Sequence, residues 1–164
     1  MIYGMRNLIK TLIFFFFLPA LLSCDQQEHS FQIVSLSKPV ASIYLPENAS
    51  TAIKYAVEDF NEDCMEVCGF KLPVISKLQD GKGNMIMPMV AEDIVALGLT
   101  ALENDLDLET LEGQWESTLI QQTDAATDQI DKILVVAGSD VMGVIYGLYE
   151  ISEKVFGTDP QKYW

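Results

Sequence analysis

The segment KILVVA, residues 132–137, restricts the fold of this chain more than any other part of the sequence. After Lys132 it is wholly apolar and rich in β-branched side chains, which is typical of a strand covered on both faces. Gly138-Ser139-Asp140 follows at once, and residues 144–156 then place apolar side chains near helical spacing. A buried strand that turns directly into a helix requires a sheet with helices packed on it.

The other apolar segments continue this alternation. Strands are predicted at residues 31–36, 41–45, 72–75, 84–90 and 117–121, and residues 123–131 are predicted to be a polar connection. Pro73 favours an edge position for its strand, and Pro88 is expected to interrupt the strand that contains it. The methionines of that strand are expected to fill the core rather than bind a metal. The alternation predicts an α/β fold, with a mixed β-sheet and helices packed on it.

One helix is indicated by its apolar stripe. Asn48 or Ser50 can cap its first turn, and Gly69 can end it in the left-handed conformation. Its apolar side chains recur at helical spacing: Ile53, Ala56, Val57, Phe60, Cys64, Val67 and Cys68. The opposite side carries groups that we expect to be solvated: Lys54, Glu58, Asp59, Glu62 and Asp63. A second helical region is predicted over residues 91–111, where Gly98 weakens the pattern.

The first residues have the layout of an export signal. Residues 1–10 carry two cations and no acid, and residues 8–22 are almost wholly apolar. This stretch of about 15 residues is shorter than the roughly 20 that a membrane-spanning helix needs. Leu21-Leu22-Ser23-Cys24 resembles a bacterial lipobox, in which the cysteine is lipidated and becomes the first residue of the mature protein. The alternative is an ordinary signal peptide in which Cys24 is incidental.

On the lipobox reading, residues 1–23 are a lipoprotein signal peptide, Cys24 is the lipidation site and residues 24–30 are a polar tether. Several acyl chains on one residue give stable membrane anchoring. We therefore expect an exported protein that is lipid-anchored to a bacterial membrane, on its periplasmic or cell-surface side.

The charge balance and the scarcity of metal-binding side chains exclude other classes of function. The chain has 10 Lys and Arg against 24 Asp and Glu, a net charge of −14, which repels the nucleic-acid backbone. The one histidine, His29, lies in the predicted tether. Cys64 and Cys68 lack the further ligands of a metal site and are expected to be small apolar core residues rather than a disulfide. No nucleic-acid partner, metal site or cofactor is predicted.

An ordered series of motifs carries a family resemblance. Gly113-Gln114-Trp115-Glu116 is followed by residues 133–140, ILVVAGSD, and by residues 143–153, GVIYGLYEISE. This series resembles the N-terminal domain of glycoside hydrolase family 115, the xylan α-1,2-glucuronidases, over roughly residues 31–164 and most strongly from Gly113 onward. The family typically shows Gly-Lys-Trp-Glu, a strand ending Ala-Gly-Ser-Asp, and Arg-Gly-Thr-Ile-Tyr-Gly-Ile-Tyr.

The chain departs from the family pattern at two places. Val141-Met142 stands where the family has an arginine, and Val144 replaces a threonine. The strand at residues 84–90 also lacks the Ile-Gly-Thr pattern common there. Ligand contacts that those loops carry in the family are therefore not transferred to this chain.

The resemblance implies that residues 31–164 are an accessory α/β domain in front of a catalytic barrel. Family members release glucuronic or 4-O-methylglucuronic acid from xylan, with carboxyl residues on that barrel. Inverting glycosidases hold their acid and base about 6.5–9.5 Å apart on a rigid scaffold, and no acids of this chain lie in a sequence context that marks such a pair. No catalytic residue is predicted, and the chain alone is expected to be inactive. Its ending on Tyr163-Trp164 suggests a domain truncated before the barrel, its missing partner.

Gly138, Ser139 and Asp140 are the candidate functional residues. They lie between a buried strand and a helix start, where free N–H groups can bind an anion such as a uronate carboxylate. The alternative is that Ser139 or Asp140 caps its own helix, which the negative charge of Asp140 and the missing arginine favour.

A second hypothesis is a stand-alone surface lipoprotein that binds a xylan-type polysaccharide or a partner protein without chemistry. A flat platform of aromatic side chains would support it. The side chains to inspect are Trp115, Tyr146, Tyr149, Tyr163 and Trp164.

Overall fold

The computed structural model describes residues 30–36, 38–127, 129–159 and 162, so the predicted signal peptide and Cys24 lie outside the described residues. The structure divides between Ser30 and Phe31, and the fold below is that of the second unit. Within the described part of the chain, no helix combines the length and the apolar character needed to cross a membrane.

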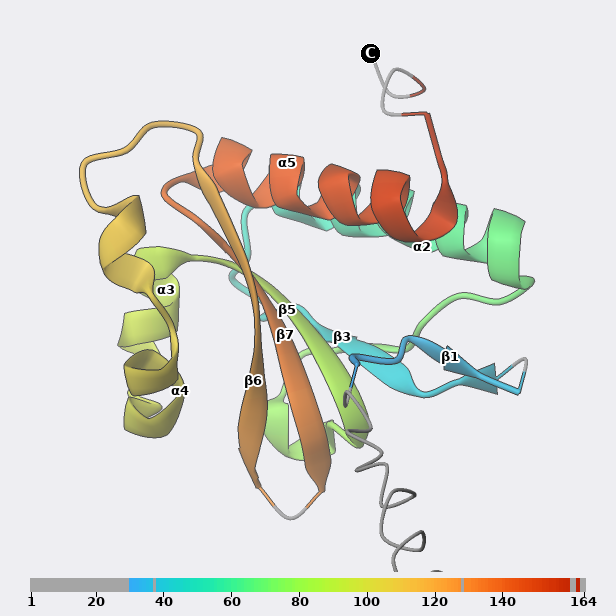
Figure 1. Cartoon of the computed structure of the whole chain (residues 1–164), viewed down its shortest axis with the longest axis horizontal. Coiled ribbons are helices and arrows are strands. Elements are labelled where there is room, and N and C mark those ends of the chain that lie inside the picture. The colour runs from blue at the N-terminus through green and yellow to red at the C-terminus, as the bar shows by residue number, and fades with distance from the viewer. Residues whose placement is uncertain (1–29, 37, 128, 160–161, 163–164) are drawn as a thin grey trace, which may run out of the picture. The chain divides into compact units, whose positions relative to one another are not determined.

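Five strands form one mixed sheet in the order β4-β3-β5-β7-β6 (Figure 1). Their bounds are β3 Ala41–Tyr44, β4 Val74–Ile75, β5 Gly83–Val90, β6 Thr118–Thr127 and β7 Ile130–Gly138. The strands β4, β3, β5 and β7 run parallel to one another, and β6 pairs antiparallel with β7. A separate two-stranded sheet joins β1 (Val34–Ser35) to β2 (Lys38–Pro39). The mixed sheet confirms the predicted fold class.

Helices cover both faces of the five-stranded sheet (Figure 1). One face packs against α2 (Thr51–Cys68) and α5 (Val141–Ile151), which continues as a π-helical turn, η3 (Ser152–Phe156). The other face packs against three short helices: α3 (Ala91–Ala96), α4 (Thr100–Asp105) and the 3-10 helix η2 (Leu108–Leu111).

Strand β7 lies between these two layers and explains the KILVVA pattern. Val136 joins the core under α2 and α5, whereas Val135 and Ala137 join the core on the opposite face. All three side chains are fully buried, because successive residues of a strand point to opposite faces and both faces are covered.

Helix α2 begins and ends where the sequence predicts. The Ser50 hydroxyl accepts a hydrogen bond from the Ile53 N–H at 3.2 Å, and Gly69 ends the helix with a φ of 82°. The predicted solvated face is wrong at Asp63, which is fully buried and pairs with Lys162 at 3.3 Å. Spacing within the helix could not reveal this ion pair, because Lys162 lies 99 residues further along the chain. The predicted stripe also extends too far, since Val67 is exposed.

Three segments differ from the sequence predictions. Residues 91–111 form three short helices rather than one. The break between the first two, α3 and α4, includes Gly98, which has a φ of 65°. The predicted connection at 123–131 is wrong, because β6 continues to Thr127 and forms a hairpin with β7. An edge strand tolerates polar side chains, so its composition resembled that of a loop. Helix α5 begins at Val141, three residues earlier than predicted.

Of the two predictions made for prolines, one is confirmed and one is wrong. The edge position predicted for the strand near Pro73 is confirmed, since β4 is the outer strand of the sheet. Pro88 does not interrupt β5 as predicted; it pairs in register with Val136. Pairing of β5 with β3 ends at Ile86, so at Pro88 the strand has a neighbour on one side only and the missing N–H is tolerated. Lys38-Pro39 forms the short strand β2. The methionines of β5 are buried in the core, as predicted.

We expect Gly143→Ala to destabilise the fold. A Cβ at this position of α5 would lie 2.1 Å from the carbonyl oxygen of Ser117, a backbone atom that no rotamer change can move. The substitution should lower the free energy of unfolding by about 3 kcal/mol or more, although alanine is ordinarily the better helix former by roughly 0.5–1 kcal/mol. Urea denaturation measures the change.

The control is Gly69→Ala, where the added Cβ meets nothing within 4 Å and only the left-handed backbone is disfavoured. That cost is about 1 kcal/mol. A loss at Gly143 no larger than the loss at Gly69 would contradict the close-approach argument.

Candidate functional site

The chain reverses its direction of travel through the sheet at β3. It passes from β3 through α2 to β4 on one side, and then returns to β5 on the other side of β3. In open α/β sheets, ligands bind outside the carboxyl ends of the strands at such a point. A cavity of about 270 Å³ lies there, with Tyr44 and Val90 at the strand ends and Val141 at the start of α5 among its walls. Most of its lining is apolar, and its Ser50 hydroxyl already caps α2.

The predicted Gly138-Ser139-Asp140 turn lies next to this cavity and is bonded to the loop at residues 113–117. The Asp140 carboxylate accepts one hydrogen bond from the Glu116 N–H and one from the Gly143 N–H, each at 2.9 Å. The Ser139 hydroxyl accepts from the Ser117 N–H at 3.0 Å, and the Ser139 N–H donates to the Ser117 carbonyl oxygen at 2.9 Å. Two stretches that are more than 20 residues apart therefore form one bonded unit.

Asp140 acts as the N-cap of α5 in this unit. Hydrogen bonds from the Glu116 N–H, and then from Gly143 and Met142, lower the pKa of its carboxyl group. An ionised carboxylate thus already occupies the N-terminus of α5 and repels a second anion. Gly138 is required by packing, because a Cβ there would lie 2.4 Å from the Val144 nitrogen. The geometry of the turn is that of a helix cap.

Trp115 is the exposed aromatic side chain of this surface. It is 80% exposed, and the next residue, Glu116, has a φ of 51°, a strained value for a residue with a side chain. The bonds of Ser139 and Asp140 hold the loop in this conformation. Trp115 is therefore held in an exposed position by a loop whose backbone is fixed by hydrogen bonds.

The other aromatic residues do not build a platform around Trp115 within the described residues. The Tyr149 hydroxyl donates to a carboxylate oxygen of Asp59 at 3.1 Å and links α5 to α2. Burial, and then this hydrogen bond and the Asp59 charge, raise the pKa of Tyr149 to about 12. Tyr146 is half-buried on α5, and Tyr163 and Trp164 lie outside the described residues.

Asp140 does not have the electrostatics of a glycosidase general acid. A general acid needs a raised carboxyl pKa, whereas the pKa of Asp140 is lowered. Glu150 forms an ion pair with Lys154 on the helix surface.

No cluster of His, Cys, Asp and Glu in the described part could hold a metal ion. Burial, and then the neighbouring Cys68, raise the pKa of the buried Cys64 thiol to about 12, so this thiol is not a nucleophile near neutral pH.

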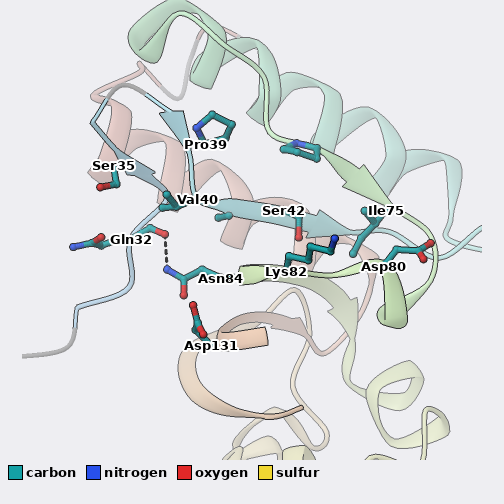
Figure 2. A pocket seen from close by; sticks show the side chains of 13 residues that line it. Gln32, Ser35, Pro39, Val40, Ser42, Ile75, Asp80, Lys82, Asn84 and Asp131 are labelled. Atoms are coloured by element: carbon teal, nitrogen blue, oxygen red, sulfur yellow. Dashed lines mark hydrogen bonds between the residues drawn. The ribbon is translucent and has the colours of Figure 1, made fainter. Parts of the chain in front are cut away.

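A second, larger cleft was missed by the sequence reasoning. It has a volume of about 610 Å³ and lies at the opposite, amino ends of the strands (Figure 2). Its polar lining includes Ser42, Lys82, Asn84 and Asp131. The charged turn Asp80-Gly81-Lys82-Gly83, before a buried strand, is the signal in the sequence that could have indicated it.

The fold and its reversal point define an open α/β domain with helices on both faces. No family model matches the chain, and no curated protein matches its sequence. Among solved structures, the chain is similar to BtGH115A, described as a family GH115 4-O-methyl-α-glucuronidase with specificity for decorated arabinogalactans. The TM-score is 0.53 and the identity 21%, over 77% of this chain and 14% of that one. The likeness shows a shared fold, and the chain spans only this small part of the enzyme's length.

We expect Asp140→Ala to weaken the fold and release the Trp115 loop. Loss of the cap should cost about 1–2 kcal/mol at pH 7. Because the pKa of Asp140 is lowered in the folded state, its ionised form stabilises the fold above the unfolded pKa of about 4, and this contribution is lost as the pH falls below it. The gap between wild type and variant in denaturation midpoint should therefore narrow between pH 7 and pH 3.

Trp115 fluorescence in the folded variant should also shift, because the Glu116 N–H loses its acceptor. The control is Glu58→Ala, which removes an exposed carboxylate from the middle of α2. It should change neither the denaturation midpoint nor the Trp115 fluorescence appreciably. A gap that stayed constant with pH would contradict the role given to the ionised carboxylate.

Proposed function

We propose that residues 31–164 form a non-catalytic N-terminal α/β domain of an exported glycoside hydrolase related to the xylan α-1,2-glucuronidases. Its role is to pack against and position the catalytic barrel. One observation carries the proposal: the motifs of the resemblance, at residues 113–116 and 138–140, meet in the fold and are bonded through Asp140. Short motifs that matched a family by chance would not need to touch. The similarity in fold to part of BtGH115A supports the same assignment.

Trp115 is the contact residue under this proposal. Its exposed indole and bonded loop suit a hot-spot contact, in which a rigid aromatic group enters a pocket of the partner. Hydrolysis of hemicellulose side chains belongs to the full-length enzyme, and a xylan-type polysaccharide is that enzyme's substrate. The proposal assigns no catalytic residue to this chain.

The proposal also includes export and lipid anchoring at Cys24, with residues 24–30 as the tether. The net charge of −14 gives little attraction to anionic lipid surfaces, so the acyl chains are the membrane contact.

Cys24→Ser should abolish lipidation. Expressed in a bacterial host grown with radiolabelled palmitate, the wild-type chain should carry label and sediment with membranes, whereas the variant should lose both properties because its hydroxyl does not replace the thiol in lipoprotein processing. Cys68→Ser is the matched control and should keep the label, since Cys68 is a half-buried residue of α2. Label on the Cys24→Ser chain would disprove the assigned site.

The main experiment compares this chain with the product of the DNA beyond the Trp164 codon. A reading frame that continues into a long βα repeat is the expected result. In a Trp164→Phe background, acrylamide quenching of Trp115 should be strong in the 164-residue chain and several-fold weaker in the longer protein, because the barrel covers the indole.

Glucuronic acid release from glucuronoxylan should be detected for the longer protein and not for the 164-residue chain. A stop codon followed by unrelated sequence would reject the accessory role and favour a stand-alone surface lipoprotein that binds a polysaccharide or a partner protein. Hydrolysis by the 164-residue chain itself would reject the non-catalytic assignment.

A further inference from the structure

The cleft at the amino ends of the strands is built from several segments of the chain. Ser42 comes from β3 and forms part of the lining, while Asp80 and Lys82 precede β5 and Asp131 lies at the start of β7 (Figure 2). The β1–β2 hairpin contributes Pro39 to another wall. The segments before β3, β5 and β7 meet because these three strands are adjacent in the sheet.

The backbone around the cleft is fixed by hydrogen bonds. Gly83 has a φ of 66°, and a Cβ there would lie 2.9 Å from the Val40 carbonyl oxygen, so only glycine lets β5 start this close to β3. The Asn84 N–H donates to that same oxygen at 3.1 Å. The Asn84 side-chain amide donates to the Gln32 carbonyl oxygen at 2.7 Å, a bond drawn in Figure 2. The backbone on either side of Gly83 and the Asn84 side chain are therefore held in place before any ligand binds.

Ser42 is the unusual member of this lining. It is only 6% exposed, and its hydroxyl has no hydrogen-bond partner among the described residues. A buried hydroxyl that bonds to nothing is unfavourable, and an alanine at the same place would avoid the penalty. A polar group that enters the cleft can supply the partner that the Ser42 hydroxyl lacks.

The charges of the lining restrict what that group is. Two carboxylates, Asp80 and Asp131, face one cation, Lys82, so an anion is disfavoured. A metal ion is disfavoured too, because Lys82 would compete for the carboxylates. Uncharged hydroxyl groups suit this lining, since they donate to the carboxylates and accept from the ammonium. Part of the remaining wall is apolar, from Pro39, Pro73 and Ile75, and can cover the C–H face of a ring.

We propose that this cleft is a binding site for a neutral sugar residue, with Ser42, Lys82 and Asp131 as its hydrogen-bonding groups. The site is distinct from the Trp115 surface and lies at the other end of the sheet, and the choice of xylan sugars as its probes rests on the proposed function. The volume of about 610 Å³ accommodates one or two sugar rings. Because the rim is open and exposed, a single residue should bind with a dissociation constant of about 1–10 mM.

Backbone amide shifts of the full chain, recorded by NMR during titration to about 100 mM, test the proposal. The probes are D-xylose, xylotriose and D-glucuronate. Xylose and xylotriose should move the amides of Ser42, Gly83 and Asn84 in a saturable way, and glucuronate should bind at least about tenfold more weakly because of the two carboxylates. Equal affinity of xylose and xylotriose identifies a single-residue site, whereas tighter xylotriose identifies a site for a glycan chain; either result supports the proposal.

Variants locate the site. Ser42→Ala and Asp131→Asn should each weaken xylotriose binding by about tenfold, the effect of one good hydrogen bond. The matched controls, Lys77→Met and Asp107→Asn, alter exposed groups outside the cleft and should leave affinity within about twofold of wild type. Unchanged thermal denaturation midpoints show that the variants are folded.

Three results would overturn the proposal. The first is no saturable shift with either neutral sugar, which means that the cleft holds solvent only. The second is glucuronate binding more tightly than xylose, and the third is full affinity in the Ser42→Ala variant. These outcomes are independent of the reading frame beyond Trp164, so a failure here is distinguishable from a failure of the proposed function.

Discussion

The close approach of α5 to the β6–β7 pair is the constraint on which the rest of the domain depends. The Gly143 backbone lies against the Ser117 carbonyl, closer than any side chain would permit. This contact brings the first turn of α5 beside the loop that precedes β6, and the Asp140 carboxylate can then bridge the Gly143 and Glu116 N–H groups. The strained backbone at Glu116 persists because this bonding over-determines it. The position of Trp115 is therefore a consequence of how the helix packs.

Sequence reasoning works well where the deciding signal is local. Helix α2 is a case: its cap at Ser50, its stripe through Phe60 and its end at Gly69 are each set by neighbouring residues. The pattern of β7 is also self-contained. Asp63 and β6 show the limit, because the ion-pair partner of Asp63 lies 99 residues away and the polar stretch of β6 becomes a strand only through pairing with β7. Pro88 was misjudged because its tolerance depends on where β3 ends, which no local pattern reveals.

The same distinction applies to the sites. The turn at residues 138–140 stood out because a buried strand and a helix start flank it, but nothing local identified Glu116 and Ser117 as its partners. Ser42 was missed for a different reason. In the segment ASIYL it is one polar residue in an apolar strand, and such residues commonly face solvent. Its burial without a partner follows from the hairpin and the glycine turn that surround it, which are assembled only in the folded chain.

The polar groups at the two ends of the sheet differ in how far they are already hydrogen-bonded. In open α/β sheets, ligands usually bind outside the carboxyl ends of the strands. At the carboxyl ends the cavity is small and mainly apolar, and the polar groups around it bond to one another: Ser50 with α2, and Ser139 and Asp140 with the Trp115 loop. Groups satisfied in this way stiffen a surface and leave little for a ligand to bind. At the amino ends the backbone is also hydrogen-bonded, but the buried Ser42 hydroxyl has no hydrogen-bond partner among the described residues. A rigid surface whose polar groups are already bonded is suited to contact with a protein partner. A rigid surface with unbonded polar groups is suited to a small polar ligand. Of the buried hydroxyls that line the cavities at the two ends of the sheet, the Ser42 hydroxyl at the amino end is the one without a partner in the described part of the chain, and the proposed sugar site rests on it.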